Sequence, residues 1–137
     1  MARRNLKLVT LLTDFGLEGP YVPAMKGALL TRCPDAVIVD VSHELPAHDV
    51  LSAGLVLAHS APHFPPGTLH VVVVDPTVGT DRRLLYARFG GQQFLFPDNG
   101  VITFVAGALP LETVRVCRNS DYVPAAPPSS TFHGRDV

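Results

Sequence analysis

The chain has 137 residues, of which 47% are hydrophobic and 17% are charged. This length suits one domain that removes about 68% of its unfolded surface from water, and the apolar content excludes an intrinsically disordered chain. Eleven Lys and Arg residues against 12 Asp and Glu residues give a net charge of −1 without a sustained basic run, which excludes a surface that neutralises many phosphates of a nucleic acid. The 11 Gly and 13 Pro residues indicate many sharp turns, as in a loop-rich α/β or β protein.

The cysteines and the N-terminus indicate a cytoplasmic protein. Cys33 and Cys117 are too few for a disulfide framework and too far apart for a short metal-binding motif, so a reducing compartment is expected. The first apolar run is broken by Lys7 and Asp14 and lacks a small-residue cleavage site, which argues against a secretory signal. No apolar stretch approaches the roughly 18 residues that span a bilayer, so no membrane partner is expected.

Short apolar runs rich in β-branched residues predict buried strands, and helical spacing between them predicts two helices. In chain order, the sequence predicts a strand at Leu8 to Leu12, a helix after Pro20, a strand at Val37 to Val41, a helix after Asp49, a strand at Leu69 to Val74, and a hairpin of Leu84 to Phe89 and Gln92 to Phe96. Because connections of this length form right-handed crossovers, the first three strands should lie parallel. The predicted class is therefore α/β, a mainly parallel, Rossmann-like sheet flanked by helices, with a β-hairpin added.

Single residues predict several boundaries. Asp49 should cap the second helix at its N-terminus, and Pro62 should end that helix shortly after His59. Gly90-Gly91 should form the two-residue turn of the hairpin. From Ser120 the Pro-rich and Ser-rich segment predicts an exposed loop or linker, and the polar cluster 131–137 then ends so abruptly that truncation is expected.

Three carboxylates, Asp14, Asp40 and Asp75, end apolar runs or lie in their last turn. Because parallel sheets bind ligands outside their carboxyl ends, at least two of these groups should gather at one edge. Asp40 is interpreted as an ordinary turn former or helix cap. Asp75 differs, because the tight loop after it should return a guanidinium, from Arg82 or Arg83, toward the carboxylate and hold it ionised.

Several familiar motifs are absent. Asp14-Phe15-Gly16 matches a kinase tripeptide, but the chain has no glycine-rich phosphate loop and no catalytic-loop His-Arg-Asp. It also lacks G-x-G-x-x-G and Walker A sequences, which favours a ligand without phosphates. Among the histidines, His59 and His63 are expected to be surface or packing residues, and His43 and His48 are expected in a loop. His133 is equally consistent with a functional and an ordinary role.

Six segments taken together resemble one family, the S-adenosyl-L-methionine hydroxide adenosyltransferases, relatives of the fluorinase and chlorinase. The segments follow one another in the family's order along nearly the whole chain: Thr13-Asp14-Phe15-Gly16, Pro20-Tyr21-Val22 with Met25-Lys26-Gly27, Val41-Ser42-His43-Glu44-Leu45-Pro46, Val74-Asp75-Pro76 with Val78-Gly79-Thr80, Pro97-Asp98-Asn99-Gly100 and Thr131-Phe132-His133-Gly134-Arg135-Asp136. The resemblance implies that residues 1–137 are the N-terminal α/β domain, ending before its last segment is complete, and that the family's C-terminal β-barrel domain is absent.

The resemblance implies that water attacks the 5′ carbon of S-adenosyl-L-methionine and releases methionine and adenosine, with no cofactor and no metal. It implies a water-holding set of Asp75, Arg82 and His133. Arg82 would orient Asp75 and stabilise negative charge on the nucleophile, since a guanidinium stays protonated, while Asp75 and His133 polarise the water. By the same resemblance Asp14 accepts the two ribose hydroxyls, and the substrate is lined by Tyr21, His48, Pro76 and Phe132.

Three positions distinguish this sequence from the fluorinase or from the usual hydrolases of the family. The fluorinase has Tyr where this chain has Asp75, and a halide-contacting Ser where it has Gly134, so halide transfer is disfavoured. Thr77 stands where hydrolases of the family usually have Gly, and a positive φ there would strain the loop that follows Asp75.

Two other functions stay open from the sequence. A metal-dependent nucleoside hydrolase would use Asp14, Asp75, Asp98 and His133 as ligands. A folded remnant would bind adenosine or a partner without turnover. Family sites lie between the N-terminal domain of one subunit and the C-terminal domain of its neighbour in a homotrimer, so the fold of this chain and the activity of this chain alone are separate questions.

Overall fold

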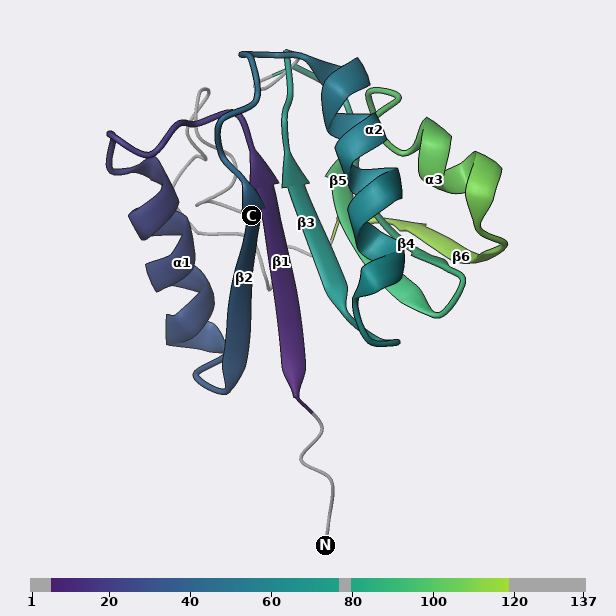
Figure 1. Cartoon of the computed structure of the whole chain (residues 1–137), viewed down its shortest axis with the longest axis horizontal. Coiled ribbons are helices and arrows are strands. Elements are labelled where there is room, and N and C mark those ends of the chain that lie inside the picture. The colour runs from purple at the N-terminus through teal and green to yellow at the C-terminus, as the bar shows by residue number, and fades with distance from the viewer. Residues whose placement is uncertain (1–5, 77–79, 119–137) are drawn as a thin grey trace, which may run out of the picture.

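Helices cover both faces of a mixed sheet in the computed structural model, which describes residues 6–76 and 80–118 (Figure 1). In chain order, the elements are β1 (Lys7–Thr13), α1 (Tyr21–Arg32), β2 (Ala36–Ser42), α2 (Val50–Ser60), the 3-10 helix η1 (Ala61–His63), β3 (Leu69–Val73), β4 (Leu84–Phe89), β5 (Gln92–Pro97), α3 (Thr103–Ala108) and β6 (Leu111–Val116). The predicted α/β class, five strands and two helices are confirmed. The helix α3 and the strand β6 were not expected from the sequence.

The strands of the described chain lie in the order β2-β1-β3-β5-β4-β6. Parallel pairs join β1 to β2, β1 to β3 and β3 to β5, while β4 runs antiparallel to β5 and β6. The chain moves outward from β1 to β2 and then crosses back to place β3 on the other side of β1. The strand order therefore reverses between β1 and β3, and open α/β sheets bind ligands beyond the carboxyl ends of the strands at such a point.

Neighbouring residues of β1 point into two separate cores, because side chains alternate along a strand. Leu12 packs with Leu57 of α2 and Val105 of α3 in the larger core, whereas Leu11 packs with Met25 of α1 in the smaller one. Figure 1 shows α1 beside β2 and β1, with α2 and α3 over the other half of the sheet. Burial on both faces fixes the register of β1, since a slip of one residue would turn each side chain toward the opposite face of the sheet and so into the wrong core.

The predicted boundary residues act as expected. The Asp49 carboxylate accepts a hydrogen bond from the Ser52 backbone N–H at 3.0 Å, which caps α2, and hydrogen bonds from Ser52 lower the pKa of Asp49. The helix ends at Ser60, just before Pro62. Gly90 and Gly91 have φ values of 53° and 78°, as a two-residue hairpin turn with both central residues at positive φ requires. Among the described residues, no helix is long and apolar enough to cross a bilayer.

Candidate active site

The two carboxylates at the switch point follow adjacent strands. Thr13, the last residue of β1, pairs with Val73, the last residue of β3, so Asp14 and Asp75 leave the same edge of the sheet one and two residues later. The loop after β5 is joined to this edge, because the Asn99 side-chain amide donates to the Val74 carbonyl oxygen at 2.9 Å. The predicted gathering of strand-end carboxylates at one sheet edge is confirmed for these two residues.

Asp75 forms a buried ion pair. Its Oδ2 accepts a hydrogen bond from Arg82 Nε at 2.5 Å, and the side chains of Asp75 and Arg82 are only 4% and 11% exposed. The predicted return of a guanidinium to this carboxylate is therefore confirmed. A paired, ionised carboxylate held in one orientation can accept a hydrogen bond from a water molecule and polarise it.

Arg83 takes a different partner from its neighbour. Its Nε and Nη2 donate to Asp98 Oδ2 at 2.9 and 2.6 Å, and the Asp98 backbone N–H donates to the Arg83 carbonyl oxygen at 2.8 Å. This pair is exposed, with side-chain exposures of 56% and 37%. The adjacent arginines before β4 thus pair with two different carboxylates, Arg82 with Asp75 after β3 and Arg83 with Asp98 after β5.

Asp14 is held by the loop that follows β2. Its Oδ2 accepts a hydrogen bond from the His48 backbone N–H at 2.7 Å. His48 reaches this position with a φ of 61°, which is strained for a residue other than glycine. His48 is exposed, and its contact with Asp14 is made by the backbone.

The remaining predicted substrate residues divide between described and undescribed parts of the chain. The Tyr21 ring lies 5.9 Å from the Phe15 ring between centroids, so Tyr21 stands beside the turn that carries Asp14. Pro76 is exposed and directly follows Asp75. Thr77, Phe132, His133 and Gly134 lie outside the described residues, so their predicted roles stay predictions.

The interpretation of Asp40 as a turn former or cap was wrong. Asp40 lies inside β2, where its two oxygens accept hydrogen bonds from His43 Nε2 at 2.7 Å and Lys26 Nζ at 2.6 Å. Burial raises the pKa of Asp40, but the hydrogen bonds from Lys26 and His43, together with the charge of Lys26, outweigh burial and lower that pKa below its ordinary value. Asp40 is therefore an ionised link between α1 and the start of the loop after β2.

The histidines also differ from one another more than the sequence indicated. His59 and His63 are exposed, so of the two expected environments, surface or packing, they have the first. His43 is only 3% exposed and is hydrogen-bonded through both ring nitrogens. His43 was expected from the sequence to be an ordinary loop residue, without a role in the site. His43 lies directly after β2, at the edge where the parallel strands end. Open α/β sheets bind ligands at that edge, so this position is the signal that could have found it.

The proposed metal ligands do not form a cluster in the described chain. Within residues 6–76 and 80–118, no group of three or more His, Cys, Asp or Glu side chains could hold a metal ion. Asp75 and Asp98, two of the suggested ligands, instead face Arg82 and Arg83. A guanidinium at each carboxylate opposes cation binding electrostatically, so the metal-dependent alternative loses support.

A family model described as "SAM hydroxide adenosyltransferase N-terminal domain" matches residues 9–137. The chain belongs to this family. It is 41% identical to a protein of Methanocaldococcus jannaschii named (R)-S-adenosyl-L-methionine hydrolase, over 96% of this chain and 50% of that protein. A protein of the same name from Thermus thermophilus is 39% identical, over 96% of this chain and 54% of the relative.

This SAM hydroxide adenosyltransferase N-terminal domain also resembles a more distant enzyme and a solved structure. A fluorinase of Actinoplanes is 24% identical, over 95% of the chain and 51% of the relative. A crystal structure from Thermotoga maritima superposes with a TM-score of 0.91 at 38% identity, over 94% of this chain and 49% of that one. The chain therefore spans about half the length of the curated relatives it matches.

Proposed function

We propose that the protein carrying this chain hydrolyses S-adenosyl-L-methionine to adenosine and L-methionine. The observation that carries the proposal is the buried Asp75–Arg82 pair at the switch point of a chain about 40% identical to proteins named as hydrolases of this compound. The chain contributes residues 1–137 as an N-terminal domain. By family resemblance, the complete protein is a cytoplasmic homotrimer with a C-terminal β-barrel domain.

In the proposed reaction, the water oxygen forms a bond to the 5′ carbon while the bond from that carbon to sulfur breaks. The sulfur keeps the electron pair and leaves as the neutral thioether of methionine, so the leaving group needs no proton and the reaction needs no metal or cofactor. The proton of the attacking water passes to Asp75 or His133 and then to solvent. Placing the water in line with the carbon–sulfur bond supplies part of the roughly 7–11 kcal/mol that positioning contributes in enzymes.

Each residue has a distinct part in this proposal. Asp75 accepts a hydrogen bond from the water, and Arg82, which stays protonated, fixes the orientation of Asp75 and stabilises negative charge on the nucleophile. Asp14 accepts hydrogen bonds from the ribose hydroxyls. Tyr21, His48, Pro76 and Phe132 line the substrate.

The test uses the complete protein with S-adenosyl-L-methionine in ¹⁸O-labelled water, with and without a chelator. We expect adenosine that carries ¹⁸O at the 5′ position, together with methionine, at a rate that the chelator does not change. Free adenine, or activity that the chelator abolishes, would favour a nucleoside hydrolase and overturn the proposal. Adenosine binding without turnover would favour the non-catalytic remnant.

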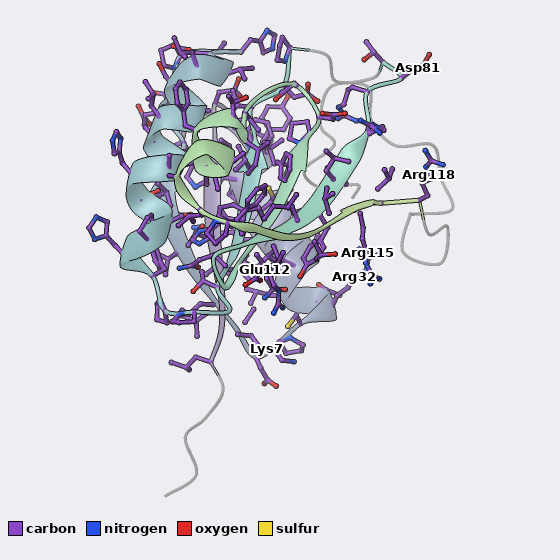
Figure 2. The ribbon with its side chains drawn as sticks, turned by 90° about the vertical axis from the view of Figure 1, so that its right-hand side faces the viewer. Lys7, Arg32, Asp81, Glu112, Arg115 and Arg118 are labelled. Atoms are coloured by element: carbon purple, nitrogen blue, oxygen red, sulfur yellow. The ribbon has the colours of Figure 1, made fainter. Side chains whose placement is uncertain are left out.

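Asp75→Asn tests the proposed acid–base residue against a matched control from the same loop. Asp81 is exposed at the outer edge of the molecule (Figure 2), so Asp81→Asn removes the same charge without touching the buried pair. We expect Asp75→Asn to lower kcat by about 10²- to 10⁴-fold, the usual contribution of a positioned acid or base, and Asp81→Asn to leave it within twofold.

A further inference from the structure

A buried chain of hydrogen bonds lies behind the turn that carries Asp14. Thr13 Oγ1 is 2.8 Å from His43 Nδ1, and His43 Nε2 is 2.7 Å from Asp40 Oδ1. Asp40 Oδ2 in turn accepts a hydrogen bond from Lys26 Nζ at 2.6 Å. Thr13 and His43 are 0% and 3% exposed, whereas the Asp40 and Lys26 side chains are 40% and 34% exposed, so the chain runs from the surface to the buried end of β1.

The partners determine the direction of these hydrogen bonds. The carboxylate of Asp40 only accepts, so His43 Nε2 carries a proton and donates it. In the neutral imidazole, Nδ1 then accepts from the Thr13 hydroxyl, whose oxygen also accepts from the Phe15 backbone N–H at 3.2 Å. Every polar atom of the Thr13 and His43 side chains is satisfied in this arrangement.

The order Asp, His, Thr resembles the triads that activate hydroxyl nucleophiles, but Thr13 is not suited to attack a substrate. Its side chain is fully buried, and its hydroxyl oxygen receives the Phe15 N–H. A nucleophile needs access to the substrate carbon, and these contacts leave Thr13 inside the protein. The arrangement therefore acts on the backbone that follows Thr13.

That backbone is the Asp14 turn, and His43 holds it in two ways. Its side chain orients the Thr13 hydroxyl that receives the Phe15 N–H, and its carbonyl oxygen accepts from the Gly16 backbone N–H at 2.7 Å. Asp14 lies between these two contacts. The His48 N–H, five residues further along the same loop as His43, binds the Asp14 carboxylate itself.

We infer that Thr13 and His43, with Asp40 behind them, are positioning residues that fix the Asp14 carboxylate for a vicinal diol. The inference rests on the proposed function, in which Asp14 receives the ribose hydroxyls. Two hydroxyls on adjacent carbons bind one carboxylate well only in a narrow range of orientations, because both hydrogen bonds must be nearly linear. A turn held at Phe15 and Gly16 keeps the carboxylate in that range before the ligand arrives, which reduces the entropy lost on binding.

The test separates positioning from simple stabilisation by comparing two ligands of the complete protein. Calorimetry or competition measures the affinity for adenosine, which has the diol, and for 2′,3′-dideoxyadenosine, which lacks it. Thr13→Val keeps the shape and removes the hydroxyl, while Thr13→Ser restores the hydroxyl. We expect Thr13→Val to weaken adenosine binding about tenfold and to change dideoxyadenosine binding less than twofold, with Thr13→Ser within threefold of the parent.

A second variant keeps the inference testable if the Thr13→Val protein does not fold. Asp40→Asn changes a half-exposed residue and keeps one acceptor for His43, and we expect about threefold weaker adenosine binding with unchanged dideoxyadenosine binding. Equal weakening of both ligands, or no weakening of adenosine, would overturn the inference. If the parent protein neither binds adenosine nor hydrolyses S-adenosyl-L-methionine, the proposed function fails and the inference fails with it.

Discussion

The burial of the Asp75–Arg82 pair leads to a quantitative prediction about stability. Arg82→Met keeps most of the side-chain volume but leaves the Asp75 carboxylate, 4% exposed, without its guanidinium. Removing one partner of a buried ion pair costs about 3–5 kcal/mol because the other charge stays buried and uncompensated. We expect the free energy of unfolding at neutral pH to fall by this amount.

The neighbouring residue is a closely matched control. Arg83 pairs with Asp98 at 2.6 Å, nearly the 2.5 Å of the Arg82–Asp75 contact, but its side chain is 56% exposed rather than 11%. Water screens such a pair, so Arg83→Met should cost less than about 1 kcal/mol. The two variants therefore differ in burial far more than in contact distance.

Urea denaturation followed by circular dichroism measures the free energy of unfolding of both variants and of the double variant Asp75→Asn/Arg82→Met. The double variant should be more stable than Arg82→Met alone, since the buried negative charge of Asp75 is gone. Equal costs for Arg82→Met and Arg83→Met would show that burial does not set the strength of the Asp75–Arg82 pair. A double variant less stable than Arg82→Met would refute the assignment of that cost to the buried carboxylate of Asp75.

Three further predictions concern stability. A Cβ at Gly54 would lie 2.8 Å from the Val101 carbonyl oxygen, so we expect Gly54→Ala to lower the free energy of unfolding by about 1–3 kcal/mol. The control Gly27→Ala has open space around the new methyl group and should raise the free energy of unfolding by up to about 1 kcal/mol. Equal melting temperatures of the two variants would contradict this prediction. Burial lowers the pKa of His70, so the unfolded state binds a proton at this residue more readily than the folded state does. The contribution of His70 to stability should be complete above about pH 6.5 and should fall as the pH drops below that value. Urea titrations at several pH values measure this dependence, and His70→Gln should make the free energy of unfolding depend less steeply on pH. His48→Gly should raise the free energy of unfolding by about 0.5–1 kcal/mol because it relieves a φ of 61°, and a lower thermal midpoint would count against strain at this residue.

The elements that the sequence predicted well are those whose local pattern and tertiary environment agree. β1 and β3 are rich in β-branched residues and lie inside the sheet, and the glycine pair at 90–91 fits the hairpin turn whatever surrounds it. β6 gave a weaker signal because none of its residues is fully buried, so its apolar residues do not alternate cleanly. α3 has six residues, too few for a helical repeat to stand out.

The contacts of the candidate site also divide into those that the sequence predicted and those that it did not. The Asp75–Arg82 contact was predictable because both residues belong to one short loop, so sequence spacing already brings them close. The hydrogen bond between Thr13 and His43 was not predictable, because the two residues lie 30 positions apart in the sequence, with α1 and β2 between them. Contacts of this kind depend on which strands become neighbours, and a single sequence does not specify that order.

The reversal of strand order between β1 and β3 also affects how this scaffold can change during evolution. Asp14 and Asp75 follow the ends of neighbouring parallel strands, yet each is carried by its own loop with its own supporting contact, His48 for Asp14 and Arg82 for Asp75. In the proposed mechanism, exchanging Asp75 therefore alters the group that polarises the attacking water, while Asp14 keeps its own supporting contact. Because the two loops are supported independently, the same sheet can carry different residues after β3, and the relatives of this chain bear names as different as hydrolase and fluorinase.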